Sequence, residues 1–312
     1  IVSLADYAGT WQTNNLTVSP NGSEKIGGIN ADVILNTEGQ SVTFVYVDGT
    51  QGWINVQDST SNERGNEFIT ATGGTITTCG NDKIHTFTGP GTFTVSAAAA
   101  CATNNIVSHM VVAGGGGGGT GNPGAGGGGG AGGYREVKSP VTPYTASPLD
   151  GYPSSPNRVT VSAQAYPITV GGGGARGVAG ASPPCNQSGC AGSNSVFSTI
   201  TSAGGGSARQ PTSNPGNGGS GGGAGTSGAG GGTGNTPPTT PAQGTDGGTA
   251  SPGSASGDGA GGGGGAGGVG GNGADATVNT GGAGGGGAYC GGSAGSGGAG
   301  GSGIVVIRYK FQ

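Results

Sequence analysis

Residues 106–119 read IVSHMVVAGGGGGG, an apolar β-type segment that runs without a break into six glycines. The same order, a strand and then glycines, returns at residues 166–174 (YPITVGGGG) and 195–206 (SVFSTITSAGGG). The chain closes at residues 301–311 with GSGIVVIRYKF, its strongest strand pattern. Because a linker has no reason to repeat this order, we expect the glycine-rich part to be a large insertion between strands of one sheet.

The composition departs from the average in two directions. The 312 residues include 82 glycines, but only 14 acidic and 10 basic residues, whereas average proteins contain roughly 7% glycine and about 25% charged residues. Glycine-rich composition without a strict period usually indicates a low-complexity linker, and a long flexible loop costs little extra closure entropy. The scarcity of charge argues against ordinary disorder. Together with the recurring strands, it favours an ordered insertion.

Residues 1–70 are predicted to form a small β module. Residues 41–47 (SVTFVYV) alternate with a period of two, which is typical of a half-buried strand. The Asp-Gly pair at 48–49 is a hairpin signal, and GWINV at 52–56 returns as a second strand. Long amphipathic helical patterns are absent, so this part of the chain is predicted to be all-β.

Residues 71–312 are predicted to form a second, glycine-rich domain. Its framing strands fall in residues 71–113 and 303–312, and the insertion spans residues 114–302. The predicted fold class is therefore all-β, with small β modules followed by a β-sandwich that carries a large, packed insertion of the polyglycine II type.

Physical chemistry explains how such an insertion could pack. Glycine adopts an extended left-handed helix with three residues per turn and no internal hydrogen bonds. Several such runs packed side by side could then bond N–H to C=O between neighbours, which satisfies the backbone groups. Alanine is the commonest interruption of the runs and is expected on outward faces. The candidate runs are residues 114–133, 171–180, 216–234, 259–273 and 281–303.

Two classes of partner are disfavoured. The ten cations are scattered and form no Arg-Gly-Gly repeat, so nucleic-acid binding is not expected. No apolar stretch approaches the roughly 18 to 20 residues that span a bilayer, so membrane insertion is not expected either. The sequence begins with Ile1 rather than methionine, from which we expect further residues upstream.

The five cysteines leave two interpretations open. Cys185 and Cys190 flank a short loop that a disulfide could close, and Cys79 and Cys101 could bridge the ends of one β segment. Alternatively, all five are small buried apolar residues. A zinc site is not expected, because no second pair has ligand spacing and no histidine lies near these cysteines.

No catalytic residue, metal site or cofactor is predicted. His85 and His109 are the only histidines, and both fall inside predicted strands. No Gly-x-Ser-x-Gly motif occurs between a strand and a helix, and the glycine runs lack the lysine and helix of a phosphate loop. The sequence therefore favours a protein that is not an enzyme.

Four motifs follow one another in the second domain: DKIHTF at 82–87, GTFTV at 91–95, MVVAGGG at 110–116 and GSGIVVIRY at 301–309. This order resembles the glycine-rich domain of bacteriophage tail fibre proteins and adhesins, and residues 33–57 are similar to a small β module of tail fibres. The resemblance implies an extracellular, homotrimeric virion fibre whose tip binds a bacterial surface receptor, either a glycan or an outer-membrane protein. It also implies attachment to other virion tail proteins upstream.

The segment 134–167 departs from the family's pattern, because it interrupts the glycines with aromatic residues and prolines. Tyrosine gives a large contact area at low entropy cost and is common in recognition loops. The candidate receptor-binding residues are Tyr134, Arg135, Tyr144, Tyr152 and Arg158. The alternative is that these side chains fill the edge of the glycine slab or a trimer seam.

The expected function is thus that of the distal part of a virion tail fibre, which recognises and attaches to a host. The alternative is a purely structural filament or virion decoration protein. An ice-binding protein is less favoured, because it would require a strict Gly-x-x period and a regular threonine face, and the sequence has neither.

Overall fold

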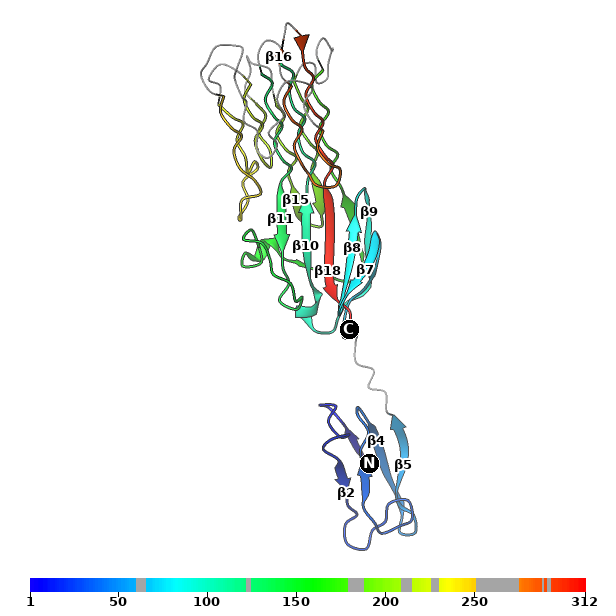
Figure 1. Cartoon of the computed structure of the whole chain (residues 1–312). Coiled ribbons are helices and arrows are strands. Elements are labelled where there is room, and N and C mark those ends of the chain that lie inside the picture. The colour runs from blue at the N-terminus through cyan, green and yellow to red at the C-terminus, as the bar shows by residue number, and fades with distance from the viewer. Residues whose placement is uncertain are drawn as a thin grey trace. The chain divides into compact units, whose positions relative to one another are not determined.

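The computed structural model describes residues 1–59, 66–121, 125–178, 188–208, 215–225, 230–250, 275–287, 289–290 and 293–312. The chain divides into two compact units, Ile1–Gly65 and Asn66–Gln312, close to the expected boundary at residue 70. In the described residues, strands and two short 3-10 helices make up the regular structure, so the all-β prediction is confirmed (Figure 1). No helix among them is long and apolar enough to cross a membrane.

The first unit holds a three-stranded and a two-stranded antiparallel sheet. The three-stranded sheet has the order β1 (Val2–Ala5), β4 (Ser41–Asp48) and β5 (Gly52–Ser59), and β2 (Leu16–Val18) pairs with β3 (Val33–Leu35). Successive side chains of a strand point to opposite faces, so Val42 and Phe44 of β4 share one face and enter a small core with Leu35.

The second unit contains two larger sheets. The first sheet has the order β11 (Tyr134–Val137), β10 (Ile106–Val112), β18 (Ile304–Lys310), β8 (Asp82–Phe87) and β7 (Thr75–Cys79), with β12 (Val159–Thr160) also paired to β10. The second sheet has the order β15 (Ile200–Ser202), β14 (Ser195–Phe197), β13 (Ala165–Thr169), β9 (Gly91–Ala97) and β6 (Thr70–Thr72). The short elements are η1 (Ala102–Asn105), η2 (Ser155–Asn157), β16 (Tyr289–Cys290) and β17 (Ser293–Ala294).

The closing strand β18 lies inside the first sheet, between β10 and β8, and pairs antiparallel with both (Figure 1). The glycine-rich residues that separate β10 from β18 in the sequence are therefore an insertion between adjacent strands of one sheet, as predicted. One core joins the two sheets: Phe93 and Phe197 of the second sheet and Tyr309 of β18 are fully buried in the same cluster.

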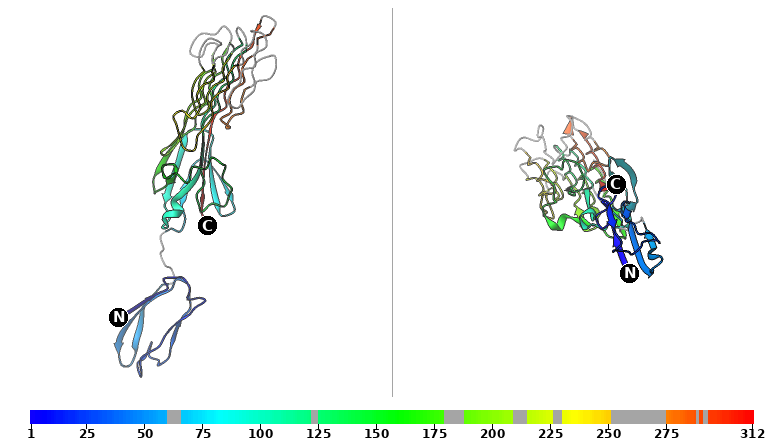
Figure 2. Two further views of the ribbon diagram at one scale, coloured as in Figure 1. Left: turned by 90° about the vertical axis from the view of Figure 1, so that its left-hand side faces the viewer. Right: turned by 90° about the horizontal axis from the view of Figure 1, so that it is seen from below.

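The glycine-rich runs stand on one end of this sandwich and extend away from it (Figures 1 and 2). Residues 113–121 continue β10 and form the central run. Six runs surround it, and these comprise residues 125–133, 171–178, 188–194, 203–208, 281–287 and 293–303. The N–H groups of Ala113, Gly114 and Gly115 donate to three different surrounding runs. The same three runs accept, in the same order, from Gly116 onward.

The carbonyl groups of the central run use the other three neighbours. Gly114, Gly115 and Gly116 accept from Gly205, Gly174 and Gly284 respectively. This three-residue repeat is that of the extended polyproline II-type helix. The six surrounding runs also bond to one another and close a ring, while residues 215–225, 230–235 and 243–250 extend the bundle on one side. The packed polyglycine II prediction is thereby confirmed for the described runs, whereas the candidate run 259–273 lies outside the described residues.

The central run consists of glycine because neighbouring backbones leave no room for a side chain. Its residues do not require a backbone conformation that only glycine adopts. None of the residues from Gly114 to Gly118 has a positive φ. A Cβ on Gly117 would lie 2.1 Å from the Ala175 oxygen, and a Cβ on Gly116 would lie 2.1 Å from the Gly206 oxygen. Each of the three directions in which a side chain could point is filled by a neighbouring backbone.

The surrounding runs have an open side, where side chains are tolerated. A Cβ on Gly172 would meet nothing within 4 Å, and the next two residues at three-residue spacing, Ala175 and Val178, are exposed. Ala125 and Ala131 are partly exposed, as expected for alanines in the runs. Ala283 differs from this expectation, because only 7% of its surface is exposed.

Candidate functional site

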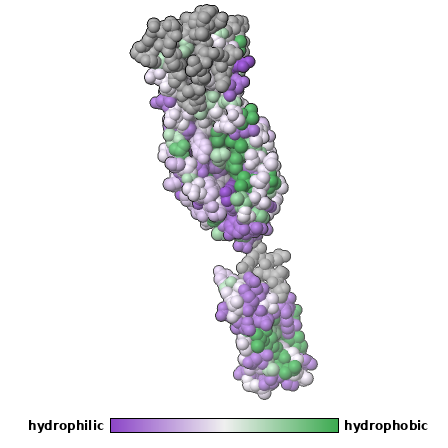
Figure 3. Space-filling view, in the orientation of Figure 1, coloured by the Kyte–Doolittle hydropathy of each residue, from purple (hydrophilic) through white to green (hydrophobic). Residues whose placement is uncertain are grey.

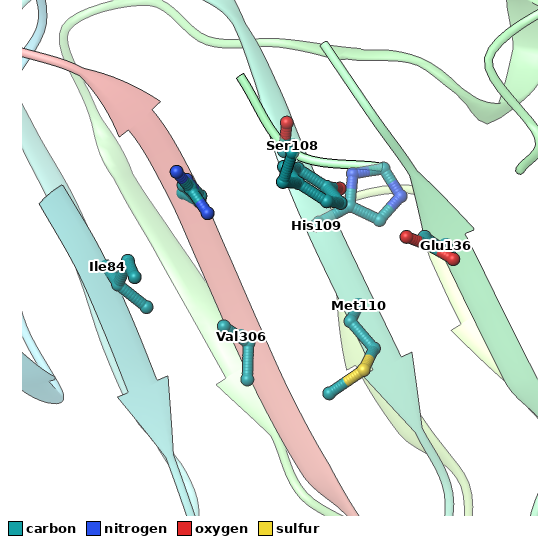
Figure 4. Close-up of a pocket in the computed structure, with 8 residues that line it drawn as sticks. Ile84, Ser108, His109, Met110, Glu136 and Val306 are labelled. Atoms are coloured by element: carbon teal, nitrogen blue, oxygen red, sulfur yellow. The ribbon is translucent and has the colours of Figure 1, made fainter. Parts of the chain in front are cut away.

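Two rows of side chains cross the outward face of the first sheet. In one row, antiparallel pairing places Glu136 of β11 beside Met110 of β10, and Met110 beside Val306 of β18 (Figure 4). The neighbouring row consists of Ser108, Arg308 and Ile84. Because side chains alternate along a strand, these residues face away from the core that holds Val107 and Ile307.

Tyr144 joins these rows from the segment that follows β11, and together with His109 of β10 they line a slot of about 190 Å³ (Figure 4). The side chains of Met110, Val306 and Ile84 give the slot an apolar floor (Figure 4). Apolar residues also gather on this face of the second unit in the space-filling view (Figure 3). The slot is large enough for one compact ring or one short branched side chain.

Tyr144 is held in place by charged neighbours. The Arg308 guanidinium lies 5.1 Å from the centre of its ring and the Lys138 ammonium lies 5.8 Å away, within the range of cation–π attraction. Burial raises the pKa of the Tyr144 hydroxyl to about 12. The phenol therefore stays protonated at physiological pH.

Glu136 is a carboxylate with little access to solvent, since only 8% of its surface is exposed. The Tyr134 hydroxyl donates to its Oε2 at 2.8 Å, and the Ser147 N–H donates to the same oxygen at 3.1 Å. Burial and the Glu136 hydrogen bond raise the pKa of Tyr134 to about 12, so this donor keeps its proton. No cation lies within ion-pair distance of Glu136 among the described residues.

Arg308, on the other side of the slot, is by contrast paired. Its Nη2 and Nε lie 2.6 and 2.8 Å from Oδ2 of Asp82. The Asp82 side chain is buried, and its Oδ1 has no hydrogen-bond partner. Arg308 therefore lines the slot with a charge that is already paired.

The sequence-predicted residues separate into two groups. Tyr144 lines the slot, and Tyr134 supports it through the hydrogen bond to Glu136. Arg135 lies on the opposite face of β11 and donates to Asn157 Oδ1 at 2.6 Å, so it ties the strand to η2. Tyr152 and Arg158 form a separate pair, in which the guanidinium lies 4.3 Å from the ring centre and Nε donates to the Tyr152 carbonyl at 2.7 Å.

Glu136, Met110 and Arg308 complete the slot but were not singled out from the sequence. For Glu136 the sequence does contain a signal, because side chains alternate along a strand. Val137 is buried, so Arg135 lies on the same face of β11 as Val137 and Glu136 lies on the other face.

The cysteine predictions have different outcomes. Cys79 and Cys101 are free and exposed, so the predicted bridge between them is wrong, as is the idea that both are buried. Cys79 ends β7 and Cys101 precedes η1, and these segments are not paired with each other. Cys190 is disulfide-bonded, whereas its expected partner Cys185 lies outside the described residues, as does the side chain of Cys290.

Both histidines are buried inside the second unit. The His85 Nδ1 lies 2.7 Å from the Gly73 carbonyl oxygen and its Nε2 lies 3.2 Å from the Tyr309 hydroxyl. Burial lowers the pKa of His109 to about 4, and this ring packs on Phe197. Across the part of the chain that the structure describes, no group of three or more His, Cys, Asp or Glu residues is arranged to hold a metal ion.

Comparison with known proteins gives one family. No curated protein matches the chain. The family described as the glycine-rich domain matches residues 86–310, which is more than half of the chain and includes the bundle and most strands of the sandwich. The chain therefore belongs to the glycine-rich domain family.

Proposed function

We propose that the chain is the distal part of a bacteriophage tail fibre and that it binds a receptor on the bacterial surface. The observation that carries the proposal is the construction of the second unit, in which a bonded glycine bundle continues the strands of a sandwich. At the far end of the bundle, Gly119 is joined to Gly127 and Gly287 by hydrogen bonds. Runs that end side by side on a backbone scaffold can present a surface whose sequence varies without unpacking the core.

The first unit supports contacts with other protein chains. Several of its apolar side chains are exposed, and apolar surface can mark contacts with other proteins. These are Tyr7 at 97%, Ile29 at 66%, Ile34 at 57%, Val47 at 56% and Val56 at 59% exposure. In the proposed fibre they would contact other copies in a homotrimer or other virion tail proteins. The same observation favours the second candidate, a purely structural filament.

The test is binding of the labelled, purified full chain to a panel of bacterial strains. Saturable, strain-selective binding that unlabelled chain displaces is expected of a receptor-binding fibre. The partly buried Tyr152–Arg158 pair, which lies outside the slot, can be removed by the double substitution Y152A/R158A. Deleting residues 134–167 instead would remove β11, β12 and part of β13, so loss of binding could come from unfolding alone.

Light scattering of the same preparation measures the oligomeric state. A trimer that binds selected strains agrees with the tail-fibre proposal. A folded chain that assembles into fibres, but binds no strain above the level of an unrelated protein, would contradict receptor binding and favour the structural filament.

A further inference from the structure

The slot on the first sheet contains a buried carboxyl group that has hydrogen-bond donors but, among the described residues, no cation in ion-pair contact. Glu136 is more than nine-tenths buried, and both hydrogen bonds to its carboxylate come from neutral donors on one oxygen, Oε2. Carboxylates are rarely buried to this degree unless they are paired with a cation. Glu136 therefore lacks the cation that such a position normally has.

The cations nearest to the slot are already engaged. Arg308 binds Asp82 at 2.6 Å. The Lys138 ammonium lies over the Tyr144 ring, and no ion pair between it and Glu136 occurs in the described residues. A cation that pairs with Glu136 would consequently have to come from another molecule.

The shape of the slot restricts the carrier of that cation. Met110 lies beside Glu136, and Val306 lies beside Met110 (Figure 4), so apolar side chains adjoin the carboxylate on this side. The volume of about 190 Å³ accommodates one six-membered ring or one linear four-carbon stem. An apolar floor does not stabilise a hydrated metal ion. An organic amine, by contrast, gains free energy when its carbon skeleton is buried against apolar side chains.

We infer that the slot binds a primary ammonium group carried on a compact carbon skeleton. The ammonium donates to the Glu136 carboxylate, and the skeleton covers Met110 and Val306. The inference rests on the proposed receptor-binding function and deepens it, because amino sugars and lysine side chains both present this chemistry at bacterial surfaces.

Met110 is the only methionine in the chain, and it provides a specific reporter. Methyl-labelled methionine gives one protein signal from the floor of the slot, and M110L identifies that signal by its loss. Cyclohexylamine, titrated into the full chain at low salt, should shift this signal saturably. Cyclohexanol, which has the same ring without the charge, should bind about tenfold or more weakly, because hydrogen bonds to charged groups are strong.

The substitution E136Q tests the carboxylate itself. Glutamine keeps an oxygen for Tyr134 and Ser147, so the fold is retained, and the amine should then bind no better than the alcohol. E67Q is the matched control, since Glu67 is an exposed carboxylate of the same unit, and it should leave the amine's advantage unchanged. Equal binding of amine and alcohol to the unsubstituted chain, or an undiminished amine advantage in E136Q, would overturn the inference.

Two further probes distinguish the source of the ammonium. Tighter binding of D-glucosamine would assign the slot to a glycan, and tighter binding of Nα-acetyl-lysine methylamide would assign it to a protein. If none of the three amines moves the Met110 signal, the inference fails. Strain-selective cell binding that survives E136Q would overturn the inferred role of the slot but not the proposed function. Amine binding by a chain that attaches to no cell would overturn the proposed function but not the amine site.

Discussion

The central run of the glycine bundle should not accept a single methyl group, and G117A tests this. A Cβ at residue 117 would lie 2.1 Å from the Ala175 oxygen and 2.7 Å from the Ala175 carbonyl carbon. Residues 171–178 would have to move away by more than an ångström. That run is bonded to the central run by the N–H groups of Gly174 and Gly177, at 2.7 and 2.9 Å.

The magnitude follows from these contacts. Overpacking a filled interior typically costs about 1–3 kcal/mol, and each weakened hydrogen bond costs about 1 kcal/mol more. We expect G117A to lower the free energy of unfolding by about 3 kcal/mol. For a unit of this size, that corresponds to a fall of about 6–12 °C in Tm.

The matched control is G172A, in the neighbouring run. A Cβ there meets nothing within 4 Å, and the residue does not have a positive φ. Alanine restricts the unfolded chain, so this substitution should stabilise the protein by about 0.4–1 kcal/mol.

Calorimetry of the two variants and of the unsubstituted chain measures the difference. A lower Tm for G117A together with an unchanged or higher Tm for G172A is the expected result. If both substitutions shift Tm by the same amount and in the same direction, the steric explanation of the central run is refuted.

Three further predictions concern the sandwich and the cysteines. R308M leaves the buried Asp82 carboxylate unpaired and should lower the free energy of unfolding in urea by about 3 kcal/mol. Adding D82N should restore part of the loss. An unchanged stability of R308M would contradict the role of the pair. His109 has a pKa of about 4 when folded and about 6.5 when unfolded, so the unfolded state binds more protons between these values. Stability should therefore fall by up to about 3 kcal/mol as the pH drops from 6.5 to 4, and a slope in urea titrations that H109Q leaves intact would assign the effect to other groups. Cys79 is free and Cys190 is disulfide-bonded. A maleimide should therefore label the Cys79 peptide of the folded chain, and the Cys190 peptide only after reduction, which mass spectrometry measures. Labelling in the reverse order would contradict the assignment.

The strands were predictable because their side chains carry a period. Residues 304–310 alternate between the core and the outward face, and their position after the last glycines indicated that the insertion lies within one sheet. The arrangement of the runs was not predictable in the same way. A run such as residues 114–119 has no side chains, so nothing in its sequence identifies its neighbours or the direction of each hydrogen bond.

The candidate site was predicted only in part, for a related reason. Tyr134 and Tyr144 could be chosen by residue type and by their place in a non-glycine segment. Met110 and Arg308 reach the slot only because β18 pairs with β10, and that pairing joins segments far apart in the sequence. Pairings of this kind depend on the whole fold and leave no local signal.

The order in which the chain is synthesised has a consequence for the bundle. The ribosome releases residues 113–121 long before residues 281–303, which complete the ring around them. Until residues 281–303 have emerged, the central run lacks two of its six neighbours. Contacts between segments so distant in sequence form slowly, so the complete ring can form only after those residues have been synthesised. A chain that stopped before residue 281 would lack both of these runs and strand β18, and its exposed backbone would be vulnerable to proteases.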